Sequence, residues 1–263
     1  MILLIDVGNS NIKFGFYEGR QLISYFKMAT DRGKTGDEYF LFIDSFARKE
    51  QVDLTKLAGV VICSVVPTLD PIFSSLSLRY FNMKPLFVES GIRTGLSIFT
   101  ENPKEVGADI VAGAVACVHL YTLPCIIVSF GTATVFSGIS SKKELLGVAI
   151  APGIVSSAEA LFKNTSKLPR IDVKNPQTFL GKNTNHSLQA GFYYGFQGMI
   201  QHIINGFKAE MAPENPKVII TGGLCSIYSG QLSVIDEVDP YLNLKGLAII
   251  YEKNIDYWQH SST

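Results

Sequence analysis

Two stretches of this sequence decide the fold: residues 1–19, MILLIDVGNSNIKFGFYEG, and residues 125–140, CIIVSFGTATVFSGIS. Each places an apolar run, a short glycine turn and a second apolar run in the same order, which is typical of a β-hairpin. Aligning residues 5–15 with residues 128–138 pairs Gly8 with Gly131 and Gly15 with Gly138, both 123 positions apart. This agreement at one offset predicts an internal duplication.

The first hairpin opens an alternation of strands and helices. Turns at Gly8-Asn9 and Glu18-Gly19 predict an antiparallel meander, and the apolar side chains of a later segment recur at helical spacing, namely Tyr39, Phe42, Ile43 and Phe46. The expected elements are strands at 2–6, 11–19, 21–27, 59–67 and 85–90, with a second helix at 67–80. Alternating strands and helices predict a mostly parallel sheet beyond the meander.

The second hairpin is followed by a similar series. We expect a strand at 143–152, helices at 154–163 and 186–210, a strand at 217–223 and a final segment at 244–254. Gly191, Gly195 and Gly198 lie in the longer helix and predict its close packing against another helix. The chain therefore reads as two similar α/β halves facing a cleft, residues 1–118 and 119–263, with no linker composition at the boundary.

Composition limits the class of function. Of 263 residues, 47% are hydrophobic and 17% charged, which is enough apolar material for a substantial core. Lys and Arg together number 23, as do Asp and Glu, and this balance argues against a nucleic-acid or membrane partner. Asp6 interrupts the first apolar run, so the start is neither a signal peptide nor a membrane span. Four cysteines without CxxC spacing predict buried free thiols: Cys63, Cys117, Cys125 and Cys225. We expect a cytoplasmic protein acting on a small molecule.

The two glycine turns are candidate phosphate-binding loops. Each follows a buried strand directly, so backbone N–H groups and small polar side chains can surround a polyphosphate. Asp6 would lie at the strand end and suit a magnesium ion or its waters. Either turn alone is more often an ordinary hairpin turn, whereas both in register favour a nucleotide site. Gly33-Lys34-Thr35 is similar to the end of a P-loop, but Met28 stands where that motif needs glycine.

Asp109 is the candidate catalytic carboxylate. It lies in the polar segment 101–110, ENPKEVGADI, just before an apolar run that predicts a helix. By composition such an aspartate is usually an N-cap. A carboxylate there can instead act as a general base, taking a hydroxyl proton while that oxygen attacks a γ-phosphate.

With these motifs in hand, the chain resembles the type III pantothenate kinases, members of the acetate and sugar kinase, Hsp70 and actin superfamily. The resemblance is carried first by Asp6-Val7-Gly8-Asn9-Ser10-Asn11, Gly107-Ala108-Asp109 and Gly131-Thr132-Ala133-Thr134. Further matches run the length of the chain: Thr35-Gly36-Asp37-Glu38-Tyr39, Asn102-Pro103, Ala151-Pro152-Gly153-Ile154, Gly181-Lys182-Asn183-Thr184, Thr221-Gly222-Gly223-Leu224 and Leu244-Lys245-Gly246-Leu247.

The resemblance implies a fold, an activity and a set of site residues. The fold would be α/β, with duplicated ribonuclease H-like, actin-like ATPase domains of mixed five-stranded sheets, assembled as a homodimer. The activity would be ATP-dependent phosphorylation of pantothenate to 4'-phosphopantothenate, the first step of coenzyme A synthesis, with Asp109 as general base and Asp6 near magnesium. The implied ATP contacts are Asp6, Val7, Gly8, Asn9, Ser10, Asn11, Ile12, Lys13, Gly131 and Thr132, and the implied pantothenate contacts are Gly107, Ala108, Asp109, Ile110 and, across the dimer, Thr184.

Three positions depart from the family pattern. Ser129 stands where the family usually has an aspartate that helps bind a monovalent cation, and a hydroxyl is a weaker ligand for a hard cation, which leaves a potassium or ammonium requirement open. Ile110 replaces an arginine and cannot pair with the substrate carboxylate. Thr100 replaces an aromatic residue. Two alternatives therefore stay open: a catalytically weak or silent relative that acts as a regulatory nucleotide-binding protein, and a kinase for another hydroxylated acceptor.

Overall fold

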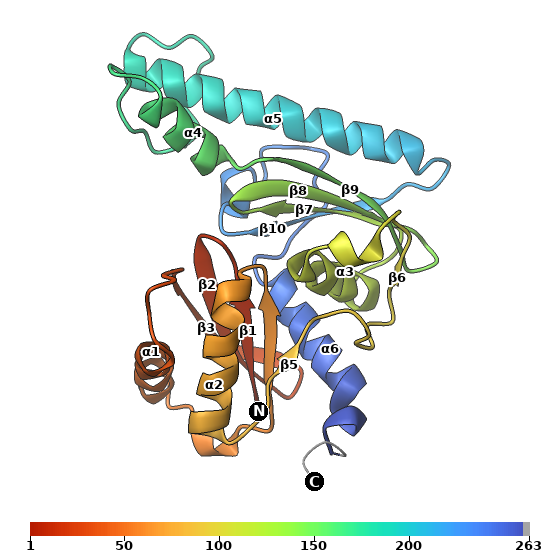
Figure 1. The fold of residues 1–263 in the computed structure, drawn as a ribbon. Helices are drawn as coiled ribbons and strands as arrows, with labels where there is room; N and C mark the ends of the chain where they lie inside the picture. The colour runs from red at the N-terminus through yellow and green to blue at the C-terminus, as the bar shows by residue number, and fades with distance from the viewer. Residues whose placement is uncertain (260–263) are drawn as a thin grey trace. The chain divides into compact units, whose positions relative to one another are not determined.

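The computed structural model describes residues 1–259, which form two compact units (Figure 1). The first unit holds residues 1–96 and 101–120 together with the C-terminal segment from residue 242. The second unit holds residues 97–100 and 121–241. The predicted boundary at residue 118 divides the chain into two continuous halves. In the structure, the C-terminal helix belongs to the first unit instead of the second.

The first unit is built on a five-stranded sheet of order β3-β2-β1-β4-β5. β1 (Ile2–Val7), β2 (Asn11–Glu18) and β3 (Gln21–Ala29) form the predicted antiparallel meander. β4 (Val60–Ser64) runs parallel to β1, and β5 (Leu86–Phe87) runs parallel to β4. The predicted change from antiparallel to parallel pairing is therefore confirmed.

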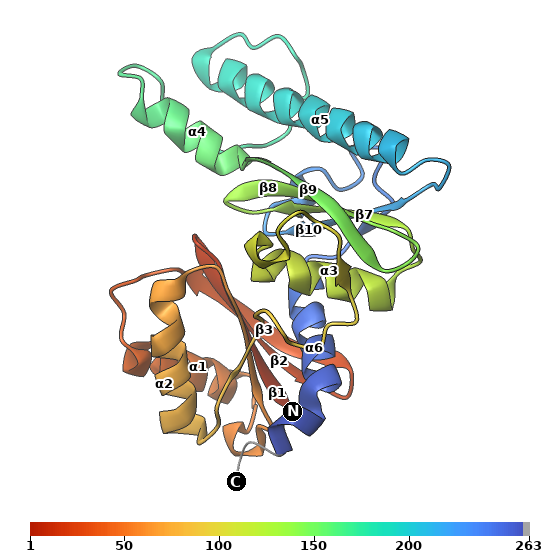
Figure 2. The ribbon, with the colours of Figure 1, turned by 45° about the vertical axis from the view of Figure 1, so that its right-hand side comes forward.

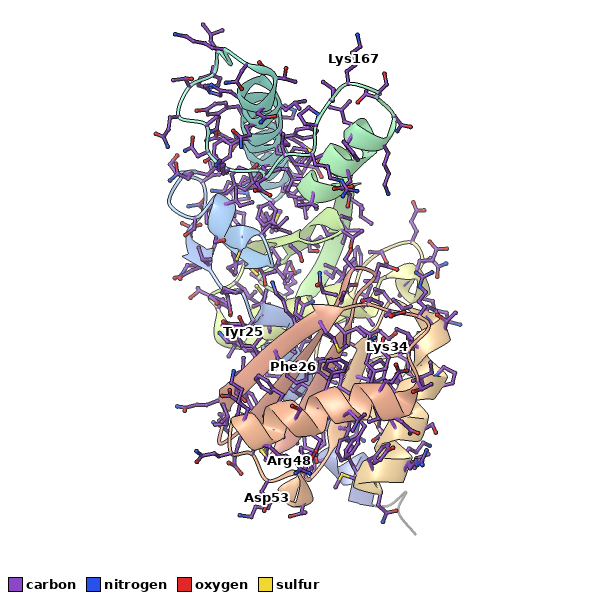
Figure 3. The ribbon with its side chains drawn as sticks, turned by 90° about the vertical axis from the view of Figure 1, so that its left-hand side faces the viewer. Tyr25, Phe26, Lys34, Arg48, Asp53 and Lys167 are labelled. Atoms are coloured by element: carbon purple, nitrogen blue, oxygen red, sulfur yellow. The ribbon has the colours of Figure 1, made fainter. Side chains whose placement is uncertain are left out.

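Two helices cover one face of this sheet, α1 (Gly36–Lys49) and α2 (Asp70–Phe81). Phe26 of β3 packs on this side, where its ring stacks on Phe14 with 4.6 Å between centroids, while the neighbouring Tyr25 projects to the other face (Figure 3). The prediction that Phe42 belongs to the buried apolar stripe of α1 is wrong, because its side chain is 49% exposed. The buried positions of α1 are Tyr39, Ile43 and Ala47, one turn apart on a single helix face.

The opposite face of the sheet carries α6 (Leu242–Gln259), and α6 packs against α3 (Ala108–Leu120) (Figure 2). α3 is apolar and buried along most of its length, as its sequence predicts. Gly246 lies so close to α3 that a Cβ atom there would overlap the carbonyl of Ala112. This close approach sets the distance between α3 and α6 at this point. Four short 3₁₀ turns complete the helical elements: η1 (Leu54–Lys56), η2 (Pro67–Leu69), η3 (Pro103–Glu105) and η4 (Cys225–Ile227).

The second unit is built on a six-stranded sheet of order β11-β10-β7-β8-β9-β6, so the expectation of five strands is wrong here. The sixth strand is a two-residue edge strand that pairs parallel to β9, and nothing in its short sequence signals a strand. The strands are β6 (Ser97–Ile98), β7 (Cys125–Phe130), β8 (Ala133–Ile139), β9 (Glu144–Pro152), β10 (Lys217–Gly222) and β11 (Glu237–Val238).

The two sheets share one connection pattern. In each, an antiparallel meander is followed by a strand parallel to its first strand and then by a further parallel edge strand. The register differs by one residue, because Gly15 opposes Leu4 whereas Gly138 opposes Ile126, the counterpart of residue 3. The first turn spans residues 8–10 and the second only 131–132, so the aligned glycines 15 and 138 are not equivalent in space.

Helices α4 (Ile154–Lys163) and α5 (Thr184–Glu210) lie on one face of the second sheet (Figure 2). The predicted close helix packing at Gly191, Gly195 and Gly198 is wrong within the chain. All three are exposed, and a Cβ atom on any of them would meet nothing within 4 Å. All four cysteines are buried and free, as predicted. Among residues 1–259, no helix is both long and apolar enough to cross a membrane.

Candidate functional site

The turn between β1 and β2 is closed by a bond from the Gly8 N–H to the Asn11 carbonyl at 3.1 Å. A Cβ atom on Gly8 would lie 2.9 Å from that carbonyl oxygen, so the turn needs glycine for close backbone approach. The Asn9 N–H donates to no group within residues 1–259 and remains available to an acceptor. These are the properties expected of a loop that binds an anion through backbone donors.

Asp6 lies beside this turn in a row of side chains that crosses the sheet. It opposes Lys13 on β2 and Cys63 on β4. Asp6 is only 6% exposed, and its Oδ2 accepts a hydrogen bond from Lys13 Nζ at 3.2 Å. A carboxylate this buried requires such a partner, because an unpaired charge away from water is costly. The row therefore presents one ion pair next to the candidate phosphate loop.

Asp109 is the second residue of α3, so the expectation that it is an N-cap is wrong. The Val111 N–H bonds to the Gly107 carbonyl at 3.1 Å, which places Gly107 at the cap position and Asp109 inside the first turn. Asp109 Oδ1 accepts from the Ile110 N–H at 2.9 Å. A Cβ atom on Gly107 would lie 2.5 Å from that oxygen, so glycine leaves room for the carboxylate to fold back over the helix start.

The pKa of Asp109 is raised above its ordinary value of 3.8. Burial is the main cause and the charge of Asp6 the second, while the Ile110 N–H, the backbone N–H of Asp109 itself and Lys13 act in the opposite direction. A carboxylate with a raised pKa accepts a proton more readily, which suits a general base. Asp6, Lys13 and Asp109 thus form one electrostatically coupled group within the first unit.

Cys63 is a member of this group that the sequence did not single out as part of the site. Its thiol is fully buried, and its pKa is raised well above 9.0 by burial and by the charges of Asp6 and Asp109. A thiol held in its neutral form is neither a nucleophile nor a metal ligand. The signal that could have placed it was the strand register, because Cys63 is the residue of β4 opposite Asp6.

The second glycine turn belongs to the second unit. The Gly131 N–H bonds to the Ala133 carbonyl at 3.0 Å, and the Thr132 carbonyl accepts from the Gly153 N–H at 3.0 Å and from Ser156 Oγ at 2.8 Å. A Cβ atom on Gly153 would overlap the backbone of the turn, so glycine is required there too. The turn is thus pinned to the start of α4.

The remaining predicted residues are divided between the two units. Ser129 is on β7, opposite Val135 and Thr221, and Thr184 is the exposed first residue of α5. Both belong to the second unit, whereas Gly107, Ala108, Ile110 and the whole first loop belong to the first. Within residues 1–259, no cluster of three or more His, Cys, Asp or Glu side chains could hold a metal ion by itself.

Comparison with known proteins decides the family. A sequence model of the type III pantothenate kinases matches residues 2–206. The chain belongs to the type III pantothenate kinase family. A relative of that name from Geotalea daltonii is 46% identical over 254 residues, covering 97% of this chain and 99% of the relative.

Solved structures share the fold of this family member. A protein from Campylobacter jejuni assigned to a Baf family of transcriptional activators has a TM-score of 0.59 at 20% identity, covering 97% of this chain and 100% of that one. A protein from Sinorhizobium meliloti described as a 2-dehydro-3-deoxygalactonokinase has a TM-score of 0.56 at 9% identity, covering 96% and 98%. With the two mixed α/β sheets, this likeness confirms the predicted actin-like, ribonuclease H-like fold.

Two departures from the pattern of the type III pantothenate kinases are visible in the structure. Ile110, at the position where an arginine was expected, offers no side-chain donor and lies directly after Asp109. The hydroxyl of Thr100, where an aromatic residue was expected, is buried without a hydrogen-bond partner among residues 1–259.

Proposed function

We propose that this chain transfers the γ-phosphate of ATP to the primary hydroxyl of pantothenate, giving 4'-phosphopantothenate in the first step of coenzyme A synthesis. The family supports the substrate, because the relatives are type III pantothenate kinases by name. The observation that carries the chemistry is the carboxylate of Asp109, with its raised pKa, beside the Asp6–Lys13 pair of the first glycine turn.

Asp109 takes the role of general base. It accepts the hydroxyl proton of the acceptor while the oxygen forms a bond to the γ-phosphorus, and the bond between that phosphorus and the β-phosphate oxygen breaks to release ADP. The bond from the Ile110 N–H occupies Oδ1 and orients the carboxylate, which leaves Oδ2 for the substrate. Gly107, Ala108 and Ile110 flank this carboxylate and would line the acceptor site, with Thr184 supplied across a dimer.

The glycine turns hold the polyphosphate in this proposal. In the first, residues Asp6 to Lys13 would provide backbone donors and the Lys13 charge, and Gly131 and Thr132 would do the same in the second. Asp6 fits magnesium because one carboxylate plus substrate phosphates is the usual protein set for this ion. Bound magnesium would supply charge neutralisation at the β- and γ-phosphates. Ser129 offers only a hydroxyl, so we expect activity that does not require potassium or ammonium.

A homodimer forms part of the same proposal. Large apolar side chains are exposed on the second unit, with Ile150 at 66%, Phe179 at 73% and Leu180 at 84%. The exposed glycines of α5 add a face on which another backbone can pack closely. Exposed apolar area of this kind marks an interaction surface, and we assign a second copy of the chain to it.

We further propose that residues 1–118 and 119–263 descend from one duplicated half. We also propose that the enzyme is cytoplasmic, the compartment that supplies its ATP.

A second candidate function follows from Ile110, Ser129 and Thr100. A chain that keeps both glycine turns but has lost acceptor and cation contacts would bind nucleotide or pantothenate without rapid turnover and act through a partner. A kinase for another hydroxylated acceptor would arise from the same losses. The three functions predict different results for nucleotide binding and for turnover of pantothenate.

The deciding experiment measures binding and turnover separately. Calorimetry with magnesium and a non-hydrolysable ATP analogue gives binding, and a coupled ADP-release assay with millimolar pantothenate, with and without potassium or ammonium, gives turnover. Turnover with pantothenate supports the kinase. Binding without turnover of pantothenate or of a panel of hydroxylated acceptors supports the regulatory alternative, and turnover of another acceptor alone supports the third.

A further inference from the structure

A second loop packs against the first glycine turn. Residues 30–35 connect β3 to α1, and Thr30 bonds twice to the turn. Its Oγ1 donates to the Gly8 carbonyl at 2.6 Å, and its N–H donates to the Ser10 carbonyl at 3.0 Å. These bonds satisfy two carbonyl oxygens of the turn, so the turn is fixed from the side of α1 while the Asn9 N–H stays open.

The connecting loop is itself firmly held. The hydroxyl of Tyr39, a fully buried residue, donates to the Asp31 carbonyl at 2.7 Å, and the Asp31 carboxylate accepts from the Gly33 N–H at 2.9 Å. Lys34, at the N-terminal end of α1 in Figure 3, pairs with the same carboxylate at 3.4 Å. Thr35 then starts α1 through a capping box. Lys34 is therefore neutralised within the loop.

Arg32 is the charge that this loop leaves uncompensated. Its side chain is exposed, and it forms no ion pair with any of residues 1–259. Its one bond runs from Nη2 to Asn9 Oδ1 on the glycine turn, at 3.4 Å. A guanidinium has five donors in a planar fork, so most of them remain free here. A long bond to a neutral amide is weaker than a charge-assisted bond to a phosphate.

We propose that Arg32 is a phosphate-binding residue of the nucleotide site, delivered to the first glycine turn by the β3–α1 loop. The inference rests on the proposed function, because it needs a polyphosphate at this turn. The Asn9 side chain holds the guanidinium in place, and the nucleotide phosphate takes over its donors on binding.

The test uses Arg32→Ala and Arg32→Lys, with Arg48→Ala as the matched control. Arg48 is an exposed arginine at the other end of α1, where it pairs with Asp44 at 2.9 Å (Figure 3). Calorimetry of each variant with ADP, with a non-hydrolysable ATP analogue and with adenosine compares ligands with and without phosphates. We expect Arg32→Ala to weaken both phosphorylated ligands by roughly 10- to 150-fold. Arg32→Lys should restore part of the loss, and Arg48→Ala should match the wild type.

Three results overturn the inference. Unchanged binding of the ATP analogue by Arg32→Ala removes Arg32 from the site, and an equal loss for adenosine assigns it a structural role only. Wild-type protein that binds none of the three nucleosides and nucleotides overturns the proposed function together with this inference. Melting temperatures of the variants establish that each is folded.

Discussion

At the scale of single residues, Asp109 has opposite effects on folding and on function. Burial and the nearby charge of Asp6 raise its pKa, so the native state holds the carboxyl proton more tightly than the unfolded chain does. For proton abstraction the shift is favourable, because the base is better matched to neutral pH. For stability it is unfavourable wherever the group must ionise, which is typical of functional carboxylates.

Asp109→Asn should therefore stabilise the protein at neutral pH. The asparagine Oδ1 can still accept from the Ile110 N–H, so the change removes mainly the buried charge. Since the folded pKa is raised, the stabilising contribution of the proton is complete below the unfolded value of 3.8 and is lost as pH rises through the folded pKa. The gain over wild type should grow from acid to neutral pH in urea unfolding curves. A variant less stable than wild type at pH 7 would contradict the assignment of the shift.

Lys13 is the partner that makes a buried Asp6 tolerable. Lys13→Met should destabilise the protein by about 1–3 kcal/mol, because it leaves a carboxylate that is 6% exposed without its hydrogen bond. The double variant Asp6→Asn with Lys13→Met serves as the control and should recover part of the loss. Denaturant unfolding of the two single variants, Lys13→Met and Asp6→Asn, and of the double variant measures the coupling. Additive effects would mean that the pair contributes nothing.

Residue patterns indicated some residues of the candidate site and missed others for physical reasons. Asp6 and Asp109 stood out because each is a charged residue at the edge of an apolar run. Cys63 and Arg32 did not, because their places depend on strand pairing and on loop closure between residues distant in the chain. The position of Asp109 inside the helix, where an N-cap was expected, depends on Gly107 taking the cap.

At the scale of elements, periodicity predicted most helices and strands because one face of each is buried. The meanders, the parallel strands β4 and β10, and helices α4 and α5 lie where their sequences indicate. The two-residue strand β6 was missed, because it is defined only by its pairing with β9 and has no sequence pattern of its own. Phe42 fits the helical spacing of α1 but lies at the edge of the buried stripe, where the stripe meets solvent.

The contact between α3 and α6 depends on one small residue. Gly246→Ala would place a methyl group against the Ala112 carbonyl, so one of the two helices must shift. We expect a loss of about 1–3 kcal/mol or more in the free energy of unfolding. Because α3 carries Asp109, turnover should fall as well.

Glu252→Ala, an exposed position on the same helix, is the control for Gly246→Ala and should change stability by less than about 0.5 kcal/mol. Thermal unfolding and turnover of both variants give the comparison. Equal stability of Gly246→Ala and wild type would show that the helices are not in close contact at this point.

At the scale of the whole molecule, the second unit exposes several large apolar side chains, among them Ile150, Phe179 and Leu180. The glycines of α5 were expected to pack against another helix of the same chain, but no other group among residues 1–259 lies within 4 Å of their Cβ positions. A sequence pattern can reveal small residues at helical spacing, but it cannot show whether they pack within the chain or against another molecule. A second copy is the occupant that the proposed dimer supplies.

Gly195→Glu tests that dimer. A charged side chain on the exposed glycine face of α5 should disrupt a close helix contact without affecting the isolated chain, since nothing lies within 4 Å of its Cβ position. Analytical ultracentrifugation should give twice 28.8 kDa for the wild type and 28.8 kDa for the variant. Lys49→Glu, on α1 of the first unit, is the control and should remain dimeric. A wild type that sediments as a monomer would contradict the proposed assembly.

Phosphorylation of pantothenate by the folded chain is the most direct test of the central claim. Wild-type protein and Asp109→Asn are incubated with ATP, magnesium and pantothenate, and 4'-phosphopantothenate is quantified by mass spectrometry. We predict product from the wild type and a rate about 10²- to 10⁴-fold lower from the variant, whose binding of the ATP analogue stays unchanged. No product from the wild type, or an equal rate from Asp109→Asn, would contradict it.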